Sequence, residues 1–336
     1  LVGSEMCIRD RRDGRRVNRR RFLAEGAAAT AVVMAASRLA AAPGGPTVVI
    51  ARDKSKQVIQ GRRIDAAIVQ KLVDQAVMRL AGKEDAAAAW GVYVKPKDKV
   101  AVKFNGLFRN ATTHPEVVQA VVKGLLAAGV PPANIVVYDR DDRALSTAGL
   151  KPGGQVTFRG TEKQFRKTID QCYGKETKAG PVGTRITKIL LDADVLINLP
   201  IMKTHGLAGI TGALKNHLGT VPNARDFHRD TCRYVADISA LPAVKDKTRL
   251  CICDALYGLY HGGPQFRPQF RFDYYGVLAA TDPVALDATL ADIIKAKRVA
   301  EGMSPYHKDT LHIARAAELN LGTADLKSIQ RVEMDV

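Results

Sequence analysis

Short apolar runs alternate along this chain with longer stretches whose apolar residues recur every three or four positions. The short runs predict strands at 47–51, 99–104, 134–138, 156–159, 194–199, 249–253 and 328–336. The stretches with helical spacing predict helices at 64–80, 114–126, 186–192, 230–240 and 284–300. This order of elements predicts a three-layer α/β fold, with a mostly parallel sheet and helices on both faces, built as one domain or as two lobes.

An export signature precedes this pattern. Arg19 and Arg20 lie in the sequence NRRRFL, which matches the twin-arginine signal, and an alanine-rich apolar stretch follows at 24–36. That stretch is shorter than the roughly 20 residues of a membrane-spanning helix, so no stable transmembrane anchor is expected. We predict that residues 12–42 are a signal peptide read by the twin-arginine translocase. The predicted location is the periplasm or another exported compartment.

The first eleven residues, LVGSEMCIRDR, resemble translated sequencing-adapter sequence, and we exclude them from the fold. Among the remaining cysteines, Cys251 and Cys253 share one face of a predicted strand, where a disulfide between them would be strained. The chain has no Cys-x-x-Cys pair, so no iron–sulfur cluster is expected. Buried free thiols are the prediction.

The charge of the chain favours anionic partners. It carries 51 Lys and Arg residues against 34 Asp and Glu, a net charge of +17. The first 42 residues hold nine arginines and four acidic residues, so the remainder is nearer +12. Carboxylates and phosphates are suitable partners for such a protein. Nucleic acid is not expected, because the chain has no basic repeat with interleaved aromatic residues.

The segment 198–229 concentrates polar chemistry directly after the predicted strand 194–199. It contains two lysines, Lys203 and Lys215, and three histidines, of which His205 and His228 are the candidates for chemistry. Glycines such as Gly212 allow the backbone to turn or to approach a ligand closely. Ligands of open α/β sheets bind at the carboxyl ends of the strands. The segment therefore predicts a site for an anion or a metal-bearing cofactor.

Other polar residues follow the predicted strands in the same way. Asn105, Asp139 and Asp254 each lie just past a strand, and a parallel sheet would bring them to one edge with Lys203 and His205. For each aspartate the alternative is a helix N-cap or a turn, and Asp282 before Pro283 predicts such a cap. The aromatic-rich segment 257–275 predicts a loop that covers the site.

Several motifs resemble the domain of unknown function 362 family. They are Lys103-Phe104-Asn105, THPEVV at 113–118, NLP at 198–200, KTH at 203–205, TGALKN at 211–216, Gly219 and DPVALD at 282–287. The resemblance implies one α/β domain of this family over residues 43–336. Many relatives carry a ferredoxin-like cysteine module that this chain lacks. We assign ligand or cofactor binding to Lys103, Asn105, Asp139, Lys203, Gly212, Asn216 and Asp254.

A second resemblance concerns mechanism. His205, Gly209, Thr211-Gly212 and Lys215 are similar to the histidine, glycine, serine-glycine-glycine and lysine pattern of the lactate racemase family. In that family the lysine tethers a nickel-pincer nucleotide and a downstream histidine ligates nickel. The resemblance implies that Lys215 anchors a cofactor and that His228, with His205, ligates nickel or another divalent metal.

Three classes of function remain open from the sequence. The first is an exported enzyme that acts on a small anionic substrate through Lys215 and His205. The second is a periplasmic binding protein for an anionic small molecule, which uses the same residues without chemistry. The third is an assembly partner of an exported redox complex.

Export gives the first testable prediction. The translocation receptor reads the paired arginines Arg19 and Arg20 rather than overall basicity. Replacement of both by lysine is expected to leave a fused reporter in the cytoplasm, measured by cell fractionation, whereas the unaltered signal delivers it to the periplasm. Unchanged export of the double variant would show that this segment is not a twin-arginine signal.

Overall fold

A mixed sheet organises the part of the chain that the structure describes. The structure is a computed structural model, and it describes residues 45–150, 156–162, 168–305 and 308–336. The strand order along the sheet is β14 (Gln330–Asp335), β1 (Thr47–Arg52), β13 (Arg271–Ala280), β12 (Thr248–Leu259), β9 (Val195–Leu199), β4 (Val100–Phe104), β5 (Ile135–Asp141) and β6 (Thr157–Glu162). Strand β13 is antiparallel to both of its neighbours, and the other neighbouring pairs in this order are parallel.

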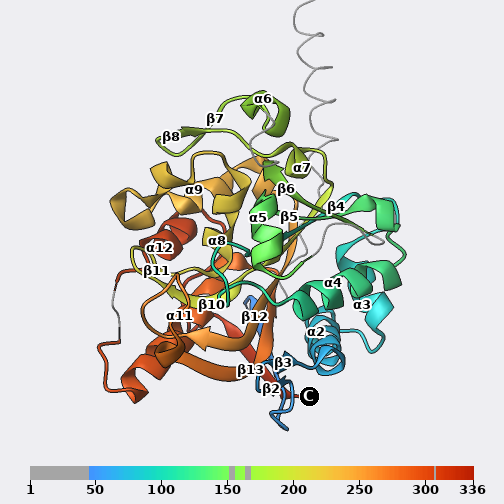
Figure 1. Ribbon diagram of the computed structural model, residues 1–336, viewed down its shortest axis with the longest axis vertical. Helices are drawn as coiled ribbons and strands as arrows, with labels where there is room; N and C mark the ends of the chain where they lie inside the picture. The colour runs from blue at the N-terminus through green and yellow to red at the C-terminus, as the bar shows by residue number, and fades with distance from the viewer. Residues whose placement is uncertain (1–44, 151–155, 163–167, 306–307) are drawn as a thin grey trace, which may run out of the picture. The chain divides into compact units, whose positions relative to one another are not determined.

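Helices cover both faces of this sheet. One face is packed by α2 (Ala66–Ala81), α3 (Ala86–Tyr93), α4 (Pro115–Ala127) and α5 (Asp142–Thr147). The other face is packed by α7 (Lys188–Leu191), α8 (Gly212–Asn216), α9 (Val235–Ala240), α10 (Pro242–Lys245), α11 (Pro283–Ala300) and α12 (Leu311–Glu318). Figure 1 shows α2, α3 and α4 on one side of the strands and α9, α11 and α12 on the other. The predicted three-layer α/β fold is confirmed.

The alternation of side chains along β1 explains why both faces need cover. Val49 and Ala51 pack with the α2 to α4 layer, whereas Val48 and Ile50 pack with α8, α11 and α12. All four side chains are buried, because successive residues of a strand point to opposite faces. A strand that is apolar at every position is therefore typical of the middle layer of a three-layer fold.

Shorter elements complete the described chain. They are the hairpins β2 (Ile59–Gln60) with β3 (Arg63–Ile64) and β7 (Thr177–Ala179) with β8 (Val182–Thr184), helix α6 (Ile169–Cys172), and the 3₁₀ turns η1 (Pro132–Asn134), η2 (His217–Thr220), η3 (Ala224–His228), η4 (Asp230–Cys232) and η5 (Pro268–Phe270). The described residues belong to one structural unit. None of the described helices has the length and apolar character needed to cross a membrane. The predicted signal peptide lies outside the described residues.

Local capping chemistry fixes two of the helix starts that the sequence predicts. The carboxylate of Asp65 accepts the backbone N–H groups of Ala67 and Ile68 at the start of α2. The carboxylate of Asp282 accepts the N–H groups of Val284 and Ala285 at the start of α11, with Pro283 in the first helical position. The predicted N-cap role of Asp282 is confirmed.

The region after β9 differs most from the sequence prediction. The chain resumes as strand β10 (Ile201–His205) after Pro200, and β10 pairs with the second half of β12 and with β11 (Gly209–Ile210). Pro200 cannot donate a ladder hydrogen bond, and its carbonyl accepts the N–H of Asp254 at 2.9 Å. Three of the five residues of β10 are polar, yet all five are buried.

Strand β12 is also longer than predicted. It continues through Asp254 to Leu259 and pairs with β13, so the predicted loop over 257–275 is wrong at its two ends, which belong to β12 and β13. The loop itself spans 260–270, contains η5 and places Pro264 in the lining of the cavity described below. The predicted helix at 230–240 is likewise shorter, because Asp230, Thr231 and Cys232 have positive φ angles and α9 begins only at Val235.

Three of the cysteines confirm the prediction of buried free thiols. Cys232, Cys251 and Cys253 are buried and unbridged in the described chain, and Cys172 is buried as well. Cys251 and Cys253 lie on the same face of β12 and pack in the core below α8 and α11. They serve there as small apolar side chains.

The contact between α3 and α4 generates a prediction about stability. A methyl group on Gly124 of α4 would overlap the indole ring of Trp90, whereas one on Gly91 of α3 would meet no atom within 4 Å. Gly124→Ala is expected to lower the free energy of unfolding by about 1–3 kcal/mol through overpacking. Gly91→Ala is expected to raise it by about 0.5–1 kcal/mol through helix propensity. Urea denaturation of both variants checks the pair, and equal stabilisation by both would contradict the packing described.

Candidate functional site

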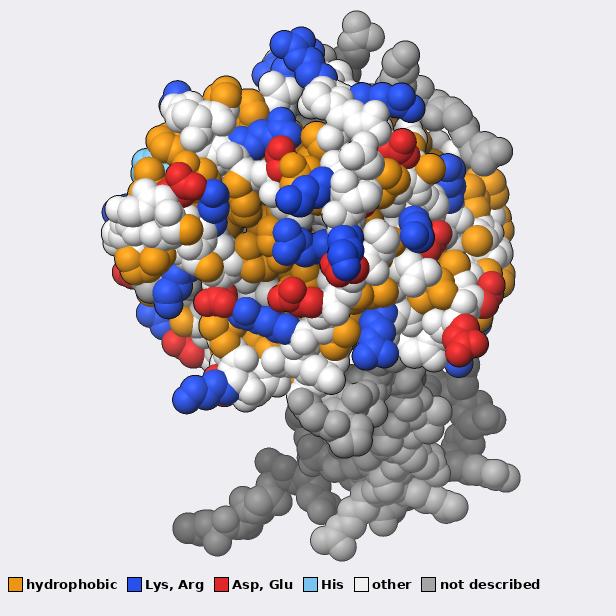
Figure 2. Space-filling model, turned by 90° about the horizontal axis from the view of Figure 1, so that it is seen from below, with side chains coloured by type: hydrophobic (Ala, Val, Ile, Leu, Met, Phe, Trp, Pro, Cys, Tyr) orange, Lys and Arg blue, Asp and Glu red, His pale blue; other side chains and the backbone are white. Residues whose placement is uncertain are grey.

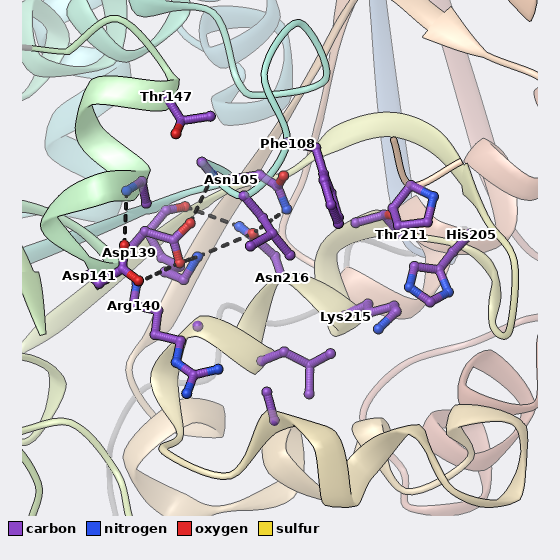
Figure 3. A pocket seen from close by; sticks show the side chains of 18 of the residues that line it. Asn105, Phe108, Asp139, Arg140, Asp141, Thr147, His205, Thr211, Lys215 and Asn216 are labelled. Carbon is purple, nitrogen blue, oxygen red and sulfur yellow. Dashed lines mark hydrogen bonds and ion pairs between the residues drawn. The ribbon is translucent and has the colours of Figure 1, made fainter. Parts of the chain in front are cut away.

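A cavity of about 260 Å³ lies at the carboxyl ends of β4 and β5, beside β10. Its lining comes from β4, β5, β10, α5, α8 and η3, together with the loop after β4. Figure 3 shows Asp139, Asp141 and Arg140 at one end of this pocket and His205, Thr211 and Lys215 at the other. The cavity therefore lies at the sheet edge where the sequence predicts a ligand site, and polar side chains from separate strands meet there.

A buried ion pair occupies the floor between β4 and β5. Lys103 Nζ lies 2.7 Å from Asp139 Oδ1, and both side chains are less than a tenth exposed. Asp139 Oδ2 accepts the N–H of Gly106 at 2.8 Å, and Oδ1 accepts that of Arg140 at 2.8 Å. A methyl group on Gly219 would overlap the Asp139 carboxylate, so a glycine is needed where η2 closes over the pair. Burial lowers the pKa of Lys103, against the attraction of Asp139.

Lys203 is a second buried lysine at this site, and its partners are neutral. Its amine donates to Asn105 Oδ1 at 2.9 Å and to the carbonyl of Ala111 at 2.5 Å. Within the described ranges it forms no ion pair with a carboxylate. Burial lowers the pKa of Lys203 to about 7, against the attraction of Asp139, and the charges of Lys215 and Lys103 lower it further. A cation held in this way is incompletely compensated, and an anion in the cavity would compensate it.

Three asparagines connect these lysines to helix α8. Asn216 Oδ1 accepts from Lys103 Nζ at 3.3 Å and from Asn105 Nδ2 at 3.1 Å. Its Nδ2 donates to Asn198 Oδ1 at 2.7 Å and to the carbonyl of Lys103 at 3.2 Å. Asn198 of β9 donates in turn to the carbonyl of Ala213. Asn105 and Asn216 are among the residues predicted to bind a ligand or cofactor, whereas Asn198 is not, although its NLP motif is one of those that resemble the family.

The far end of the cavity holds a lysine and two histidines. Lys215 Nζ lies 3.1 Å from His228 Nε2, and His228 Nδ1 lies 2.9 Å from the carbonyl of Ala224. A carbonyl only accepts, so Nδ1 carries a proton and Nε2 of neutral His228 accepts from Lys215. Burial lowers the pKa of Lys215 to about 8 and lowers that of His228 as well. Near neutral pH this amine therefore loses its proton more readily than a solvated lysine does.

His205 is the third member of this end. Its Nδ1 accepts the N–H groups of Leu207 and Ala208, each at 3.2 Å, so the proton of the neutral ring sits on Nε2. Its ring centroid lies 5.6 Å from that of His228. Burial lowers the pKa of His205 to about 2, with Lys215 acting in the same direction. His205 thus presents a neutral N–H donor at physiological pH.

A buried carboxylate from α11 orients the helix that carries Lys215. Asp287 accepts the N–H of Ala213 at 2.5 Å and that of Leu214 at 3.0 Å, at the start of α8. Gly212 has a φ of +59° there, and a methyl group on it would overlap this carboxylate. Burial raises the pKa of Asp287 to about 7, against these two hydrogen bonds. Gly212 therefore serves the helix start and does not line the cavity.

Asp254 is not at the cavity, which is a correction to the expected site. It is fully buried within β12, and its Oδ2 accepts the backbone N–H of His114 at 2.6 Å and lies 2.6 Å from His114 Nδ1. The strand continues past Asp254, so this residue does not reach the sheet edge. Its role in the fold is to hold the end of the loop 105–114. Thr113 holds the same end, because its hydroxyl donates to the carbonyl of Leu199 at 2.8 Å.

The described residues do not form a metal centre by themselves. Among them, no three His, Cys, Asp or Glu side chains are grouped so that they could hold a metal ion. Nε2 of His228 accepts from Lys215, Nδ1 of His228 donates to the carbonyl of Ala224, and Nδ1 of His205 accepts backbone N–H groups. Ligation of a metal by His205 and His228 therefore stays a prediction.

The net positive charge is distributed differently at the surface and in the cavity. On the face shown in Figure 2, lysine and arginine side chains are interspersed with acidic and apolar ones. In the cavity, by contrast, five cationic side chains meet two acidic ones: Lys103, Lys203, Lys215, Arg140 and Arg143 against Asp139 and Asp141. The fold and site thus define an α/β protein with a cationic cavity at the carboxyl edge of a parallel sheet.

Comparison with known proteins identifies the family. The model of the domain of unknown function DUF362 matches residues 94–292, and the chain belongs to this family. A thylakoid-associated protein of Synechocystis is 30% identical in an alignment of 235 residues. The alignment covers 61% of this chain and 65% of that protein. The chain therefore spans just under two thirds of that relative.

A solved structure shows a weaker similarity. The lactate racemase apoprotein from Thermoanaerobacterium thermosaccharolyticum has a TM-score of 0.42 and 10% sequence identity. The similarity covers 73% of this chain and 57% of that protein. No residue role is transferred from it.

The buried lysines predict how stability depends on pH. A lysine whose pKa is about 7 in the folded state binds fewer protons there than in the unfolded chain between pH 7 and 10.5, so its contribution to stability rises with pH over that window. The raised pKa values of the buried thiols Cys251 and Cys253 make stability fall with pH instead. This effect is the same in wild type and in Lys203→Met, so the difference between the two proteins isolates Lys203. Lys203→Met is expected to remove a rise of up to about 1.4 kcal/mol per pH unit.

Urea denaturation at pH 7, 8, 9 and 10 measures this difference. The matched control is Lys188→Met, because Lys188 is an exposed lysine on α7. Parallel stability curves for wild type and Lys203→Met would show that Lys203 titrates as a solvated lysine.

Proposed function

We propose that this protein is an exported enzyme that binds a small anionic substrate in the cavity and uses Lys215 and His205 for chemistry. The observation that carries the proposal is the setting of Lys203, whose buried amine lines the cavity and has only carbonyl oxygens as hydrogen-bond partners among the described residues. A carboxylate or phosphate beside this amine completes its electrostatic environment.

The cavity also provides a cationic frame around that position. Lys103 is already paired with Asp139, while Arg140 and Arg143 line the same cavity from the end of β5 and from α5. Arginine is suited to bidentate recognition of carboxylate and phosphate oxygens. The volume of about 260 Å³ is at the lower end for ligand sites, which favours a small molecule.

The opposite end has the groups needed for proton transfer. The Lys215 amine and His228 Nε2 share a hydrogen bond, and His205 offers a neutral N–H. A group that titrates near the working pH is effective as a general acid or base, and the pKa of Lys215 is lowered to about 8. Binding residues at one end and proton-transfer residues at the other favour an enzyme over the other two classes.

The periplasmic binding protein remains a second candidate. The observation in its favour is the complete hydrogen bonding of Asn105, Asn198 and Asn216, which fixes the cavity wall before any ligand arrives. Such prior order favours tight binding. The two candidates differ at Lys215, which an enzyme requires for turnover and a binding protein does not.

The location is part of the proposal and rests on the signal sequence. Arg19 and Arg20 support transport by the twin-arginine translocase. The relative in Synechocystis is described as thylakoid-associated.

Ligand binding tests the proposal directly. A panel of acetate, pyruvate, malate, phosphate and sulfate should contain at least one anion that raises the melting temperature. At a hundredfold excess over the dissociation constant the stabilisation is about 2.7 kcal/mol, because the ligand binds only the folded state. Differential scanning fluorimetry at pH 7 measures the shift.

Two variants localise that effect. Lys203→Gln removes the buried charge and is expected to abolish the shift, whereas Lys188→Gln changes an exposed lysine on α7 and should leave it intact. If no anion stabilises the wild type, the proposed site fails. An equal loss in both variants would mean that net charge, and not the cavity, governs the response.

A further inference from the structure

The three buried lysines of the cavity differ in what holds their amines. Lys103 is paired with Asp139 at 2.7 Å, and Lys203 donates to two carbonyl oxygens. Lys215 has a single hydrogen-bond partner among the described residues, the basic nitrogen of His228 at 3.1 Å. Its side chain lines the cavity although its residue is only 5% exposed. Of the three amines, that of Lys215 is the one that is hydrogen-bonded to a basic nitrogen, and its side chain lines the cavity.

We propose that Lys215 is a nucleophile that forms an imine with a small anion bearing a carbonyl group, of the 2-oxo carboxylate class. The inference rests on the proposed function, because it requires an anion bound in the same cavity. It goes further by naming the reactive atom, Lys215 Nζ, and the functional group that this atom attacks.

The chemistry moves both protons of the neutral Lys215 amine to the carbonyl oxygen. As the amine attacks, a C–N bond forms and the carbonyl π bond opens, and His228 Nε2, whose lone pair already faces Lys215, takes one proton from the nitrogen and passes it to the oxygen, which gives a carbinolamine. A second transfer through His228 moves the remaining N–H proton to the hydroxyl, the C–O bond breaks and the oxygen leaves as water, while the neutral Nε2–H of His205 donates a hydrogen bond to that oxygen. The sum is amine plus carbonyl giving imine plus water, with no change of oxidation state.

The positions of the charges favour a carbonyl compound that is also a carboxylate. Figure 3 places Lys215 and His205 at one end of the pocket and Arg140 at the other, with Asn105 and Asn216 between them. Lys203, which needs an anion, bonds to Asn105 in this middle region. Lys203 and Lys215 line the same cavity, so a carboxylate bound at Lys203 keeps its adjacent carbonyl in the space that Lys215 also lines, and the volume of about 260 Å³ restricts the rest of the molecule. The lowered pKa of Lys215, about 8, leaves a fraction of the amine neutral at pH 7.

Reductive trapping tests the inference. The purified mature protein is incubated at pH 7 with pyruvate, glyoxylate or 2-oxobutyrate and sodium cyanoborohydride, which converts an imine to a stable secondary amine. Intact mass spectrometry is expected to show one adduct whose mass is that of the acid less one oxygen atom. Peptide mapping is expected to place it on Lys215.

Two substitutions of Lys215 separate nucleophile from cation. Lys215→Arg retains the positive charge but is not nucleophilic near neutral pH, and Lys215→Met keeps the apolar stem without the amine. Both are expected to lower the adduct yield at least tenfold, while Lys215→Arg still shows thermal stabilisation by the same acid. Lys188→Met is expected to give the wild-type yield.

The outcomes distinguish this inference from the proposed function. Labelling spread over surface lysines, or undiminished labelling of Lys215→Met, would overturn the imine. Thermal stabilisation by the oxo acids with no adduct from any of them would also overturn it, yet would leave the anion site standing. Absence of stabilisation by every anion would remove the proposed function itself.

Discussion

The burial of three lysine side chains around one ion-paired carboxylate is the constraint on which the rest of this site depends. Asp139 neutralises Lys103, and the other two amines are left with neutral partners. Burying a charge without an opposite charge is costly, and the usual response of a lysine is a lowered pKa. Lys203 and Lys215 show that response, with pKa values of about 7 and about 8. The cavity is therefore poised to accept negative charge.

That arrangement is maintained by hydrogen bonds between elements that are distant in sequence. Asn105 follows β4, Asn198 lies on β9 and Asn216 lies on α8, and their amide groups bond to one another and to the lysines. Satisfied networks of this kind in a dry interior fix a single geometry, because any unpaired member would be expensive. A separate contact sets the start of α8, since Asp287 of α11 supplies the acceptors for its first N–H groups.

Much of the fold could be predicted from local patterns. Apolar runs located β1, β4, β5, β9 and the start of β12, and the carboxylate and proline at 282–283 located the start of α11, because these signals act within a few residues. The strand-edge rule then brought Asn105, Asp139, Lys203, His205 and Lys215 to one cavity.

The rest depended on pairings that no local pattern contains. Strand β10 is polar at three of its five positions, and only its pairing with β12 makes it a strand. For the same reason Asp254 was placed at a strand end, although the continuation of β12 beside β10 buries it against His114. The role of Asp287 follows only from the packing of α11 against the start of α8. The residues in contact are more than 70 positions apart in the chain, so no local pattern predicts it.

The loop 105–114 has consequences for how such a protein changes over evolution. Its first residue is bonded to Thr113, Thr113 is bonded to the end of β9, and His114 is bonded to Asp254 of β12, so both ends of the loop are fixed to the sheet. Between these ends, Leu107 is 69% exposed and lines the cavity with Phe108. Substitutions at these two positions alter the shape of the cavity mouth while the framework of strands remains intact. Divergence in ligand preference within this architecture can therefore proceed through a few loop side chains, without new backbone geometry and with little loss of stability.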